Sequence, residues 1–367
     1  MPSWTPGSEE TTPETVPAST PERQIPALRW GRVALTAVLL CGMALSVWEV
    51  RMRGLGLLPG DLGDGSGFWA AERRRVDQAG PDSAVILGSS RILFDTDLDA
   101  FQSITGRVPV QLALPGTGPR EFLRDLAGET RFDGLVVVGV TPTAFFRPGP
   151  GLMGAALDYA RTETPAQKMS HRLFVSLAGA FGFLDADYTL IKLIRNNRFV
   201  ERDGVEGPYG DVWKISTHGP ARQTWLWSRI ESDGYLREHA RLAWGGFSGD
   251  VVADGDIRSM ISTTRRAVDR IRSRGGEVVF IRPPSTGPLR ESENRRIPRS
   301  WGWDRLLRET GAFGIHFEDH PEMQDLDLPE WSHLSRASAT RFTRAYATVL
   351  AEQVPIHERP EQHPRQD

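Results

Sequence analysis

The chain has 367 residues, which is enough for one large domain or two small ones. Its formal net charge is −3 and its pI is about 6.3, so it lacks the excess of basic residues that marks a nucleic-acid-binding protein. The single cysteine, Cys41, excludes an intramolecular disulfide and leaves the redox compartment undecided.

The first 80 residues divide into a polar tail, an apolar segment and a linker. Residues 1–27 are rich in Pro, Thr, Ser and Glu and are predicted to be disordered, because they cannot bury enough apolar surface. Residues 28–50 are predicted to form a transmembrane anchor. Its charge-free run, 33–48, is about 16 residues long, against the roughly 20 that span a bilayer. Residues 51–80 are predicted to be a linker with a lead-in helix.

The apolar segment has an alternative interpretation as a buried core helix. A cleaved signal peptide is disfavoured, because a long polar tail precedes the segment and no small-residue cleavage site follows it closely. Arginines flank both ends, so the positive-inside rule does not choose an orientation.

Short apolar runs alternate with helical segments over residues 81–355, which predicts βαβ units and a parallel sheet. The fold class is therefore α/β, with a three-layer arrangement of a parallel sheet and flanking helices. The predicted strands are 84–88, 108–114, 135–140, 277–282 and 314–317. The predicted helices are 68–78, 120–128, 254–274, 303–310 and 335–354, and 91–103 is predicted to be a helix or a turn.

An insert at 151–245 interrupts this alternation. Its apolar part, Leu173–Ile194, is predicted to be a buried helical pair. A second membrane contact is disfavoured there, because Asp185 and Asp187 would be costly in hydrocarbon. Residues 199–245 show no clear period, and 356–367 are predicted to form a loose tail.

Polar groups follow three of the predicted strands, at the edge where parallel sheets collect functional residues. Ser90 follows the first strand, Gly116 the second and Thr141 the third. Glu330 and His333 lie three positions apart just before the last helix. This order predicts a serine nucleophile with a distant histidine and acid.

The arrangement resembles the SGNH/GDSL hydrolase superfamily over roughly 84–145 and 277–350. Gly88-Ser89-Ser90 stands where that family has Gly-Asp-Ser, which implies Ser90 as the nucleophile. Gly116 fits the glycine that supplies an oxyanion N–H. The resemblance implies an SGNH-like, flavodoxin-like fold.

Two blocks depart from the family pattern. Gly139-Val140-Thr141 replaces Gly-x-Asn, so Thr141 would have to serve as the side-chain oxyanion donor. Glu330 replaces the aspartate three residues before His333, and its longer arm changes the geometry. Asp325 and Asp327 are alternative acids, and Ser89 is an alternative nucleophile if the turn is shifted by one residue.

Gly-Ser-Ser-Arg after a strand, together with 281–284, resembles a membrane-anchored branch associated with O-acylation of envelope polysaccharides. That resemblance implies an acyl esterase or O-acyltransferase acting on an acylated or acceptor glycan, with a periplasmic domain and envelope-assembly proteins as further partners. A catalytically inactive glycan-binding or scaffold protein is the second hypothesis. An intracellular hydrolase tethered to the inner face is the third.

Candidate substrate contacts are Arg91, Trp331 and Arg282, although pairing of Arg91 with a nearby aspartate (Asp95, Asp97 or Asp99) is the favoured interpretation. No cofactor and no metal are predicted, because serine chemistry needs neither. The aspartate run lacks the glycine and closing glutamate of a calcium loop. A metal at His316, Glu318 and His320 is the less favoured alternative to a strand end that leads into a polar loop.

Overall fold

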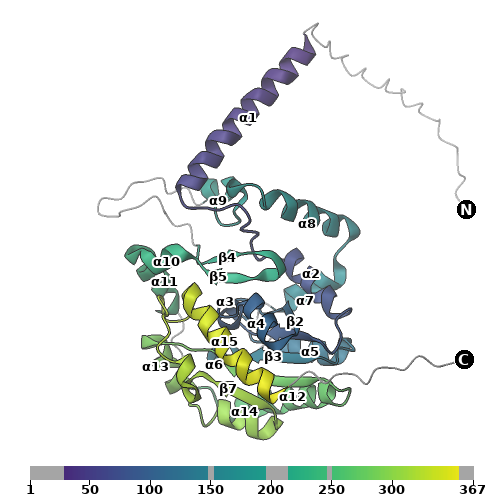
Figure 1. Ribbon diagram of the computed structural model, residues 1–367, viewed down its shortest axis with the longest axis vertical. Helices are drawn as coiled ribbons and strands as arrows, with labels where there is room; N and C mark the ends of the chain where they lie inside the picture. The colour runs from purple at the N-terminus through teal and green to yellow at the C-terminus, as the bar shows by residue number, and fades with distance from the viewer. Residues whose placement is uncertain (1–28, 148–152, 196–213, 246–249, 355–367) are drawn as a thin grey trace, which may run out of the picture. The chain divides into compact units, whose positions relative to one another are not determined.

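The computed structural model describes residues 29–147, 153–195, 214–245 and 250–354 (Figure 1). The chain forms two compact units, Met1–Trp48 and Glu49–Asp367. The predicted disorder of residues 1–27 and the predicted loose tail at 356–367 lie outside the described residues.

The apolar N-terminal segment forms one continuous helix, α1 (Trp30–Gly54). It has 25 residues. Its most apolar 18-residue window has a mean hydropathy of 2.0, and none of the residues in that window is buried. The helix is thus long and apolar enough to cross a membrane, as a signal sequence near an N-terminus would also be. Its exposure contradicts the alternative of a buried core helix, and it runs four residues beyond the predicted anchor.

Five parallel strands form the centre of the larger unit. They are β1 (Ser83–Leu87), β2 (Val108–Gln111), β3 (Leu135–Gly139), β6 (Glu277–Arg282) and β7 (Phe313–His316), in the spatial order β2-β1-β3-β6-β7. The chain therefore winds outward from β1 in both directions, which is the order of doubly wound sheets of the flavodoxin type. Every residue of β1 and β3 is buried, as expected for parallel strands covered on both faces.

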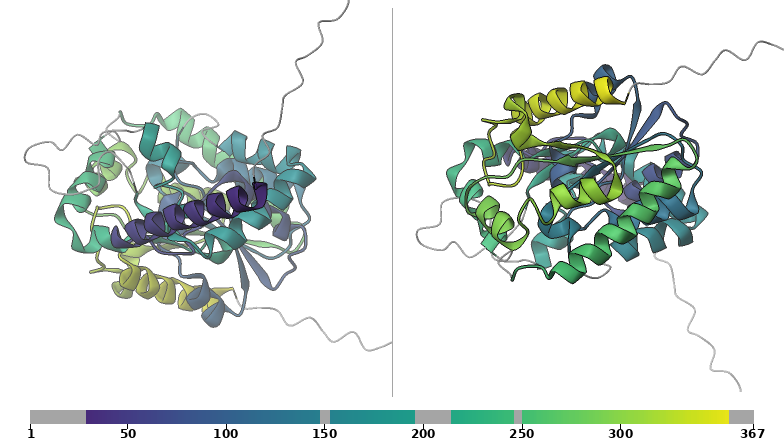
Figure 2. Two further views of the ribbon diagram at one scale, coloured as in Figure 1. Left: turned by 90° about the horizontal axis from the view of Figure 1, so that it is seen from above. Right: turned by 90° about the horizontal axis from the view of Figure 1, so that it is seen from below.

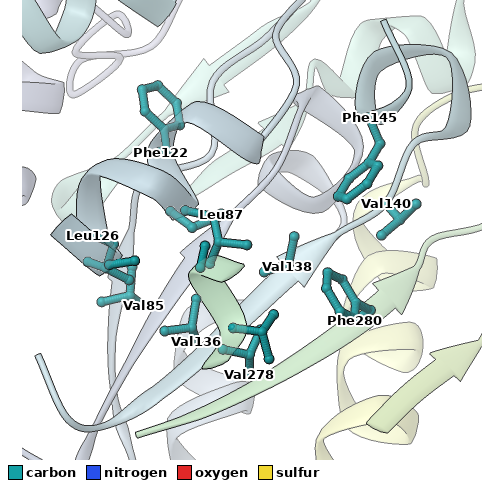
Figure 3. Packing of buried hydrophobic residues seen from close by; sticks show 14 of the residues in the cluster. Val85, Leu87, Phe122, Leu126, Val136, Val138, Val140, Phe145, Val278 and Phe280 are labelled. Atoms are coloured by element: carbon teal, nitrogen blue, oxygen red, sulfur yellow. The ribbon is translucent and has the colours of Figure 1, made fainter. Parts of the chain in front are cut away.

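Helices cover both faces of the sheet and make three layers. One face carries α5 (Arg120–Glu129), α12 (Asp254–Arg272) and α14 (Trp303–Thr310), and the other carries α4 (Leu98–Thr105) and α15 (Arg336–Gln353). The right-hand view of Figure 2 shows α15 and α12 on opposite sides of the strands. In the core of Figure 3, side chains from α5 pack onto alternate residues of three strands: Phe122, Leu126, Val85, Leu87, Val136, Val138, Val278 and Phe280.

The remaining elements surround this sheet. Before and beside it lie α2 (Ser66–Val76), α3 (Ser90–Phe94), α6 (Pro142–Phe145) and α13 (Gly287–Arg296). The insert contributes α7 (Met153–Thr162), α8 (Pro165–Ala178), η1 (Gly182–Leu184), α9 (Leu190–Arg195), β4 (Ser216–His218), η2 (Pro220–Arg222), β5 (Thr224–Leu226), α10 (Ser228–Ser232) and α11 (Gly234–Gly245). The short turns η3 (Phe317–Asp319) and η4 (Pro321–Met323) follow β7.

The prediction that Leu173–Ile194 forms a buried helical pair is correct in that the helices α8 and α9 lie there, but wrong about their burial. Leu173, Leu177, Leu190 and Ile191 are each more than half exposed. The physical reason is that α8 packs through its other side, where Ala178 joins a small cluster with Leu62 and Phe68. The antiparallel hairpin β4–β5 and the helix α13 were not predicted, because their sequences show no clear period.

A matched pair of leucines tests this core. Leu306, on α14, is fully buried, whereas Leu242, on α11, is 73% exposed. Leu306→Ala should lower the free energy of unfolding by about 2–5 kcal/mol, because it removes buried apolar atoms and leaves a cavity. Leu242→Ala should change it by less than about 0.5 kcal/mol. Urea unfolding followed by tryptophan fluorescence measures both, and equal effects would contradict the packing described.

Candidate active site

Ser90 is the first residue of α3, three positions beyond the end of β1. It is partly exposed, whereas its neighbour Ser89 is buried. At this position the backbone N–H belongs to the first helical turn, where no carbonyl of the same helix can accept it. The strand therefore delivers both a hydroxyl and a free N–H donor to the carboxyl edge of the sheet.

Gly88 allows this tight strand-to-helix turn. A Cβ at Gly88 would lie 2.2 Å from Cγ2 of Ile92 and 3.3 Å from the carbonyl oxygen of Gly139. Any larger residue would therefore push α3 away from β3. The close approach of these segments explains why the turn begins with glycine.

The predicted acid and histidine come together in one buried loop. Glu330 is fully buried and His333 is 1% exposed. Glu330 Oε1 accepts the backbone N–H of His333 and lies 2.8 Å from its ring Nδ1. Glu330 Oε2 accepts the indole N–H of Trp244 from α11. Trp331, which lies between Glu330 and His333 in the sequence, has a φ of +75°, a strained backbone conformation for a residue with a large side chain. Asp325 and Asp327 are exposed, so Glu330 is the carboxylate that contacts the imidazole.

The short helix α3 holds this loop through two rows of side chains spaced four residues apart. Phe94 lies one turn after Ser90 and stacks on the His333 ring, with 4.2 Å between ring centroids. In the other row, Arg91 Nε donates to Ser332 Oγ (3.1 Å), and Asp95 Oδ1 accepts the N–H of Leu334 (2.9 Å). Ser332 and Leu334, on the two sides of His333, are therefore bound to α3 and to the residue that follows it, and the His333 ring lies against Phe94.

Ser90 and His333 are not hydrogen-bonded to each other. Among the described residues, both ring nitrogens of His333 lack a hydrogen-bond partner while being shielded from solvent. Nδ1 is close enough to Glu330 for an ion pair, but it is not aligned to donate a hydrogen bond to that carboxylate. Catalytic hydrogen bonds are often long or misaligned before substrate binds, so this geometry leaves Nε2 available for a proton.

The two other predicted oxyanion donors lie on the neighbouring strand ends. Gly116 is exposed and has a φ of +70°, a conformation that favours glycine. The N–H of Leu114 donates to the carbonyl of Gly88 (3.0 Å), which holds this turn beside the Ser90 turn. Thr141 is buried, and its hydroxyl lies 2.7 Å from Ser89 Oγ. Thr141 thus bonds to Ser89 rather than facing solvent freely, and Ser89 is not the exposed serine.

The predicted substrate contacts Arg91 and Arg282 lie in a buried charge cluster around Glu293 of α13. Their exposed fractions are 2% and 4%, and Glu293 is fully buried. Arg91 donates to both carboxylate oxygens of Glu293, and Arg282 donates to Oε2 (2.8 Å), as does Ser285 (2.8 Å). The prediction that Arg91 pairs with Asp95, Asp97 or Asp99 was therefore wrong, because the distant Glu293 takes both of its terminal nitrogens.

The charges in this cluster shift one another's protonation. Burial alone would raise the pKa of the Glu293 carboxyl, but Arg91 and Arg282 outweigh burial and lower it to about 2. Burial lowers the pKa of Arg282 to about 10 despite the opposing effect of Glu293. Both arginines are occupied and shielded, so the structure supports a role in holding the site together.

Asp95 is a second buried carboxyl, and it behaves differently. Its Oδ2 has no hydrogen-bond partner among the described residues. Burial raises its pKa well above the usual range, and the charge of Glu330 adds to this, against the opposing N–H of Leu334 and the charge of Arg91. The environment of Asp95 therefore favours its neutral, protonated form beside the histidine loop.

No three His, Cys, Asp or Glu side chains gather as a metal site in the part of the chain that the structure describes. His316 is buried at the end of β7, where its Nδ1 accepts the N–H of Glu318 (3.2 Å). Burial, with the nearby arginines, lowers the pKa of His316 to about 3. The strand-end interpretation of this segment therefore fits better than the metal alternative.

Several residues that shape the site were missed from the sequence. Trp244 packs on His333 with 5.5 Å between ring centroids, and Arg241 lies over the ring of Trp331, which was itself predicted to lie at the site. From the insert hairpin, Arg222 donates to the carbonyls of Gln111 and Ala113 (2.8 Å each) beyond β2. The insert carries no periodic sequence signal for this contribution.

Comparison with known proteins identifies no relative: the chain matches no protein-family model, and no curated protein matches its sequence. The function is therefore inferred from the geometry of the site and from the resemblance carried by its motifs.

The Glu293 cluster predicts a defined pH dependence of stability. The pKa of Glu293 in the folded state, about 2, lies below the roughly 4.3 of a glutamate in the unfolded chain. The contribution of Glu293 to the free energy of unfolding is therefore complete above about pH 4.3 and declines as the pH falls toward 2. Glu293→Gln should lower the free energy of unfolding by about 3–5 kcal/mol at pH 7, because it leaves two buried arginines without a counter-charge. The difference between wild type and variant should narrow only below about pH 4.5. Urea midpoints from pH 2 to 7 measure this, and a constant difference would contradict it.

Proposed function

We propose that this chain is a membrane-anchored serine acyl esterase or O-acyltransferase of SGNH type that acts on cell-envelope glycans. The observation that carries the proposal is the position of His333. Its ring is buried beside Glu330, is stacked on Phe94, and lies against the helix that begins with Ser90. Parallel-strand topology and polar groups at the strand ends support the same conclusion.

The proposed mechanism gives a chemical role to each predicted site residue. Ser90 Oγ attacks the ester carbonyl while His333 Nε2 takes its proton, and Glu330 stabilises the imidazolium. The N–H groups of Ser90 and Gly116, with Thr141 beside them, stabilise the oxyanion of the tetrahedral intermediate. That intermediate collapses, the alcohol leaves with the proton from His333, and an acyl-serine remains. Water then completes an esterase cycle, whereas a sugar hydroxyl completes a transferase cycle.

The substrate class and the location belong to the same proposal. The Gly-Ser-Ser-Arg resemblance supports an envelope glycan, and the half-buried Trp331 next to Glu330 supplies an aromatic face suited to a sugar ring. We propose that α1 anchors the chain in the membrane and that the larger unit lies on the periplasmic side. A reporter fused after residue 367 and active in only one compartment tests this topology.

A second function is favoured by a specific observation. His333 Nε2 has no bond to Ser90, and the Thr141 hydroxyl is bonded to Ser89. A catalytically inactive glycan-binding or scaffold protein would need neither a Ser90–His333 hydrogen bond nor a free Thr141 hydroxyl. The two functions differ in whether Ser90 is an activated nucleophile, which covalent labelling measures directly.

Labelling with a fluorophosphonate probe, followed by peptide mass mapping, should place the adduct on Ser90. Ser90→Ala should abolish the adduct, because no other hydroxyl is proposed to be activated. His333→Ala should slow labelling by about 10²- to 10⁴-fold, the usual contribution of a general base. Ser89→Ala is the control for the neighbouring hydroxyl and should still be labelled. A folded wild-type protein without any adduct would overturn the esterase proposal in favour of the scaffold.

Trp244→Phe tests the proposed role of Glu330. The substitution keeps an aromatic ring beside His333 but removes the N–H that donates to Glu330 Oε2. A hydrogen bond to a charged group is worth about 1.5–3 kcal/mol, so labelling should slow by about ten- to a hundredfold. Trp301→Phe, at an exposed tryptophan, is the matched control and should label at the wild-type rate. Equal rates in the two variants would show that Trp244 does not position the acid.

A further inference from the structure

A band of large apolar side chains on α8 and the segment after it faces solvent. Met169, Leu173 and Leu177 recur every fourth residue along α8 and are 54%, 59% and 55% exposed. Beyond the helix, Phe181, Leu190 and Ile191 are 41%, 57% and 67% exposed. These six residues, called the apolar face below, lie within 23 consecutive positions. A concentration of this kind marks an interaction surface, since exposed hydrophobic residues are otherwise scattered singly.

Packing holds α8 in an orientation that keeps this band outward. On its inner side Ala178 is buried and Val175 is partly buried against Leu62 and Phe68. His171 also packs on Phe68, with 5.5 Å between ring centroids. The inner side of α8 is thus occupied, and the described part of the larger unit leaves the apolar face uncovered.

The chain enters the larger unit beside this face. Glu49, which directly follows the apolar stretch of α1, accepts the N–H groups of Gly182 (3.0 Å) and Phe183 (2.9 Å) through its carboxylate. The N–H of Gly60 donates to the carbonyl of Ala178 at the end of α8 (3.0 Å). The carboxyl-terminal end of α1 is thus bonded to the backbone next to Phe181. Glu49 follows the apolar stretch of α1 directly and is bonded to the backbone beside Phe181. If α1 spans a bilayer, this part of the apolar face therefore lies close to the point where the chain leaves it.

We propose that the apolar face rests in the interface of the bilayer that α1 spans, with α8 lying along the membrane surface. This inference depends on the anchor proposed above and adds a second contact between the protein and lipid. Figure 1 shows α8 and α9 together at one end of the larger unit, with α14 at the opposite end. An apolar stripe next to exposed basic residues, here Arg172 and Lys192, is the pattern of a helix that lies in a membrane interface.

The carboxylates that disfavoured a membrane contact at the sequence level are neutralised in the structure. Asp185 is buried and accepts a bond from Lys214 Nζ (2.6 Å), which also bonds Asp61. Asp187 accepts a bond from Lys192 Nζ (3.2 Å). Neither carboxylate therefore has to enter hydrocarbon without a partner when the apolar face meets lipid. The objection to this segment as a membrane contact is removed by its tertiary partners.

The test places an environment-sensitive fluorophore on the full chain in vesicles of phosphatidylcholine and phosphatidylglycerol. Cys41 is the only cysteine, so a Cys41→Ser background allows single labels at Leu173→Cys, Leu40→Cys and Trp301→Cys. Leu40 lies in the apolar stretch of α1, and Trp301 is an exposed apolar residue just before α14. Nitroxide-labelled lipids quench probes in the bilayer, and iodide quenches probes in water.

The Leu173 label should be quenched several-fold more by shallow nitroxide lipids than the Trp301 label, and should be shielded from iodide. If the lipid nitroxides quench the label at position 40 but quench the label at position 173 no more than the label at position 301, the anchor stands and the inference is overturned. If Leu40 itself is not quenched by lipid, the anchor fails and the inference fails with it. Shielding of Leu173 that grows with protein-to-lipid ratio, without lipid quenching, would assign the face to a second copy of the chain and overturn it too.

A double variant gives an independent readout. With Leu173→Gln and Leu177→Gln in place, a label at Ile191→Cys should become accessible to iodide in vesicles. The circular dichroism spectrum should stay unchanged, because both leucines are exposed and contribute little to folding. An Ile191 label that is equally shielded with and without the two glutamines contradicts membrane seating of this face.

Discussion

A buried carboxylate, Glu293, joins the segments that carry the candidate site. It accepts hydrogen bonds from Arg91 on α3 and Arg282 at the end of β6, while Arg91 also bonds Ser332 in the histidine loop. A charge in the interior is tolerated only when it is paired and hydrogen-bonded, so these segments can exist only in this relative arrangement. The cluster thus sets where α3 and the loop meet, and the position of His333 follows from it.

The five residues of α3 illustrate how a single short helix can serve stability and chemistry together. Arg91, together with Asp95 directly after the helix, binds the residues that flank His333, while Phe94, one turn after Ser90, stacks on the ring. Because side chains four positions apart lie on the same face of a helix, the bonds that one face makes to the histidine loop also fix the position of the other face relative to that loop. Burying an imidazole nitrogen without a hydrogen-bond partner costs free energy. The unpartnered nitrogens of His333 are therefore better explained by a ring that accepts a proton during a reaction than by a purely structural loop.

The insert connects this site to the proposed membrane surface. Its carboxyl-terminal part supplies Trp244 to the acid and the hairpin residue Arg222 to the end of β2, while its amino-terminal part displays the apolar face. Both parts belong to one unit with a fixed packing. Under the two proposals, the acyl chemistry would take place at a set orientation to the lipid surface, which suits a glycan substrate held near the membrane.

Much of the fold was predictable because its signals are local. The continuous apolar run of β1, the exact limits of β6 and α14, and the length of α12 follow from hydrophobic periodicity and from glycine or proline at the ends. The choice of Ser90, Glu330 and His333 depended on their places at strand ends and before the last helix. These features are properties of consecutive residues, so the sequence by itself determined them.

Only the tertiary structure decided how the distant parts meet. Arg91 has three aspartates within eight positions, yet its partner is Glu293, 202 residues away, where Arg282 pairs with the same buried carboxylate; the nearest aspartate, Asp95, is itself buried and accepts the N–H of Leu334 instead. The same holds for the apolar run in the insert, whose leucines face outward because α8 packs through its other side. Which face of a helix is buried depends on the neighbours that reach it, and no local pattern contains that information.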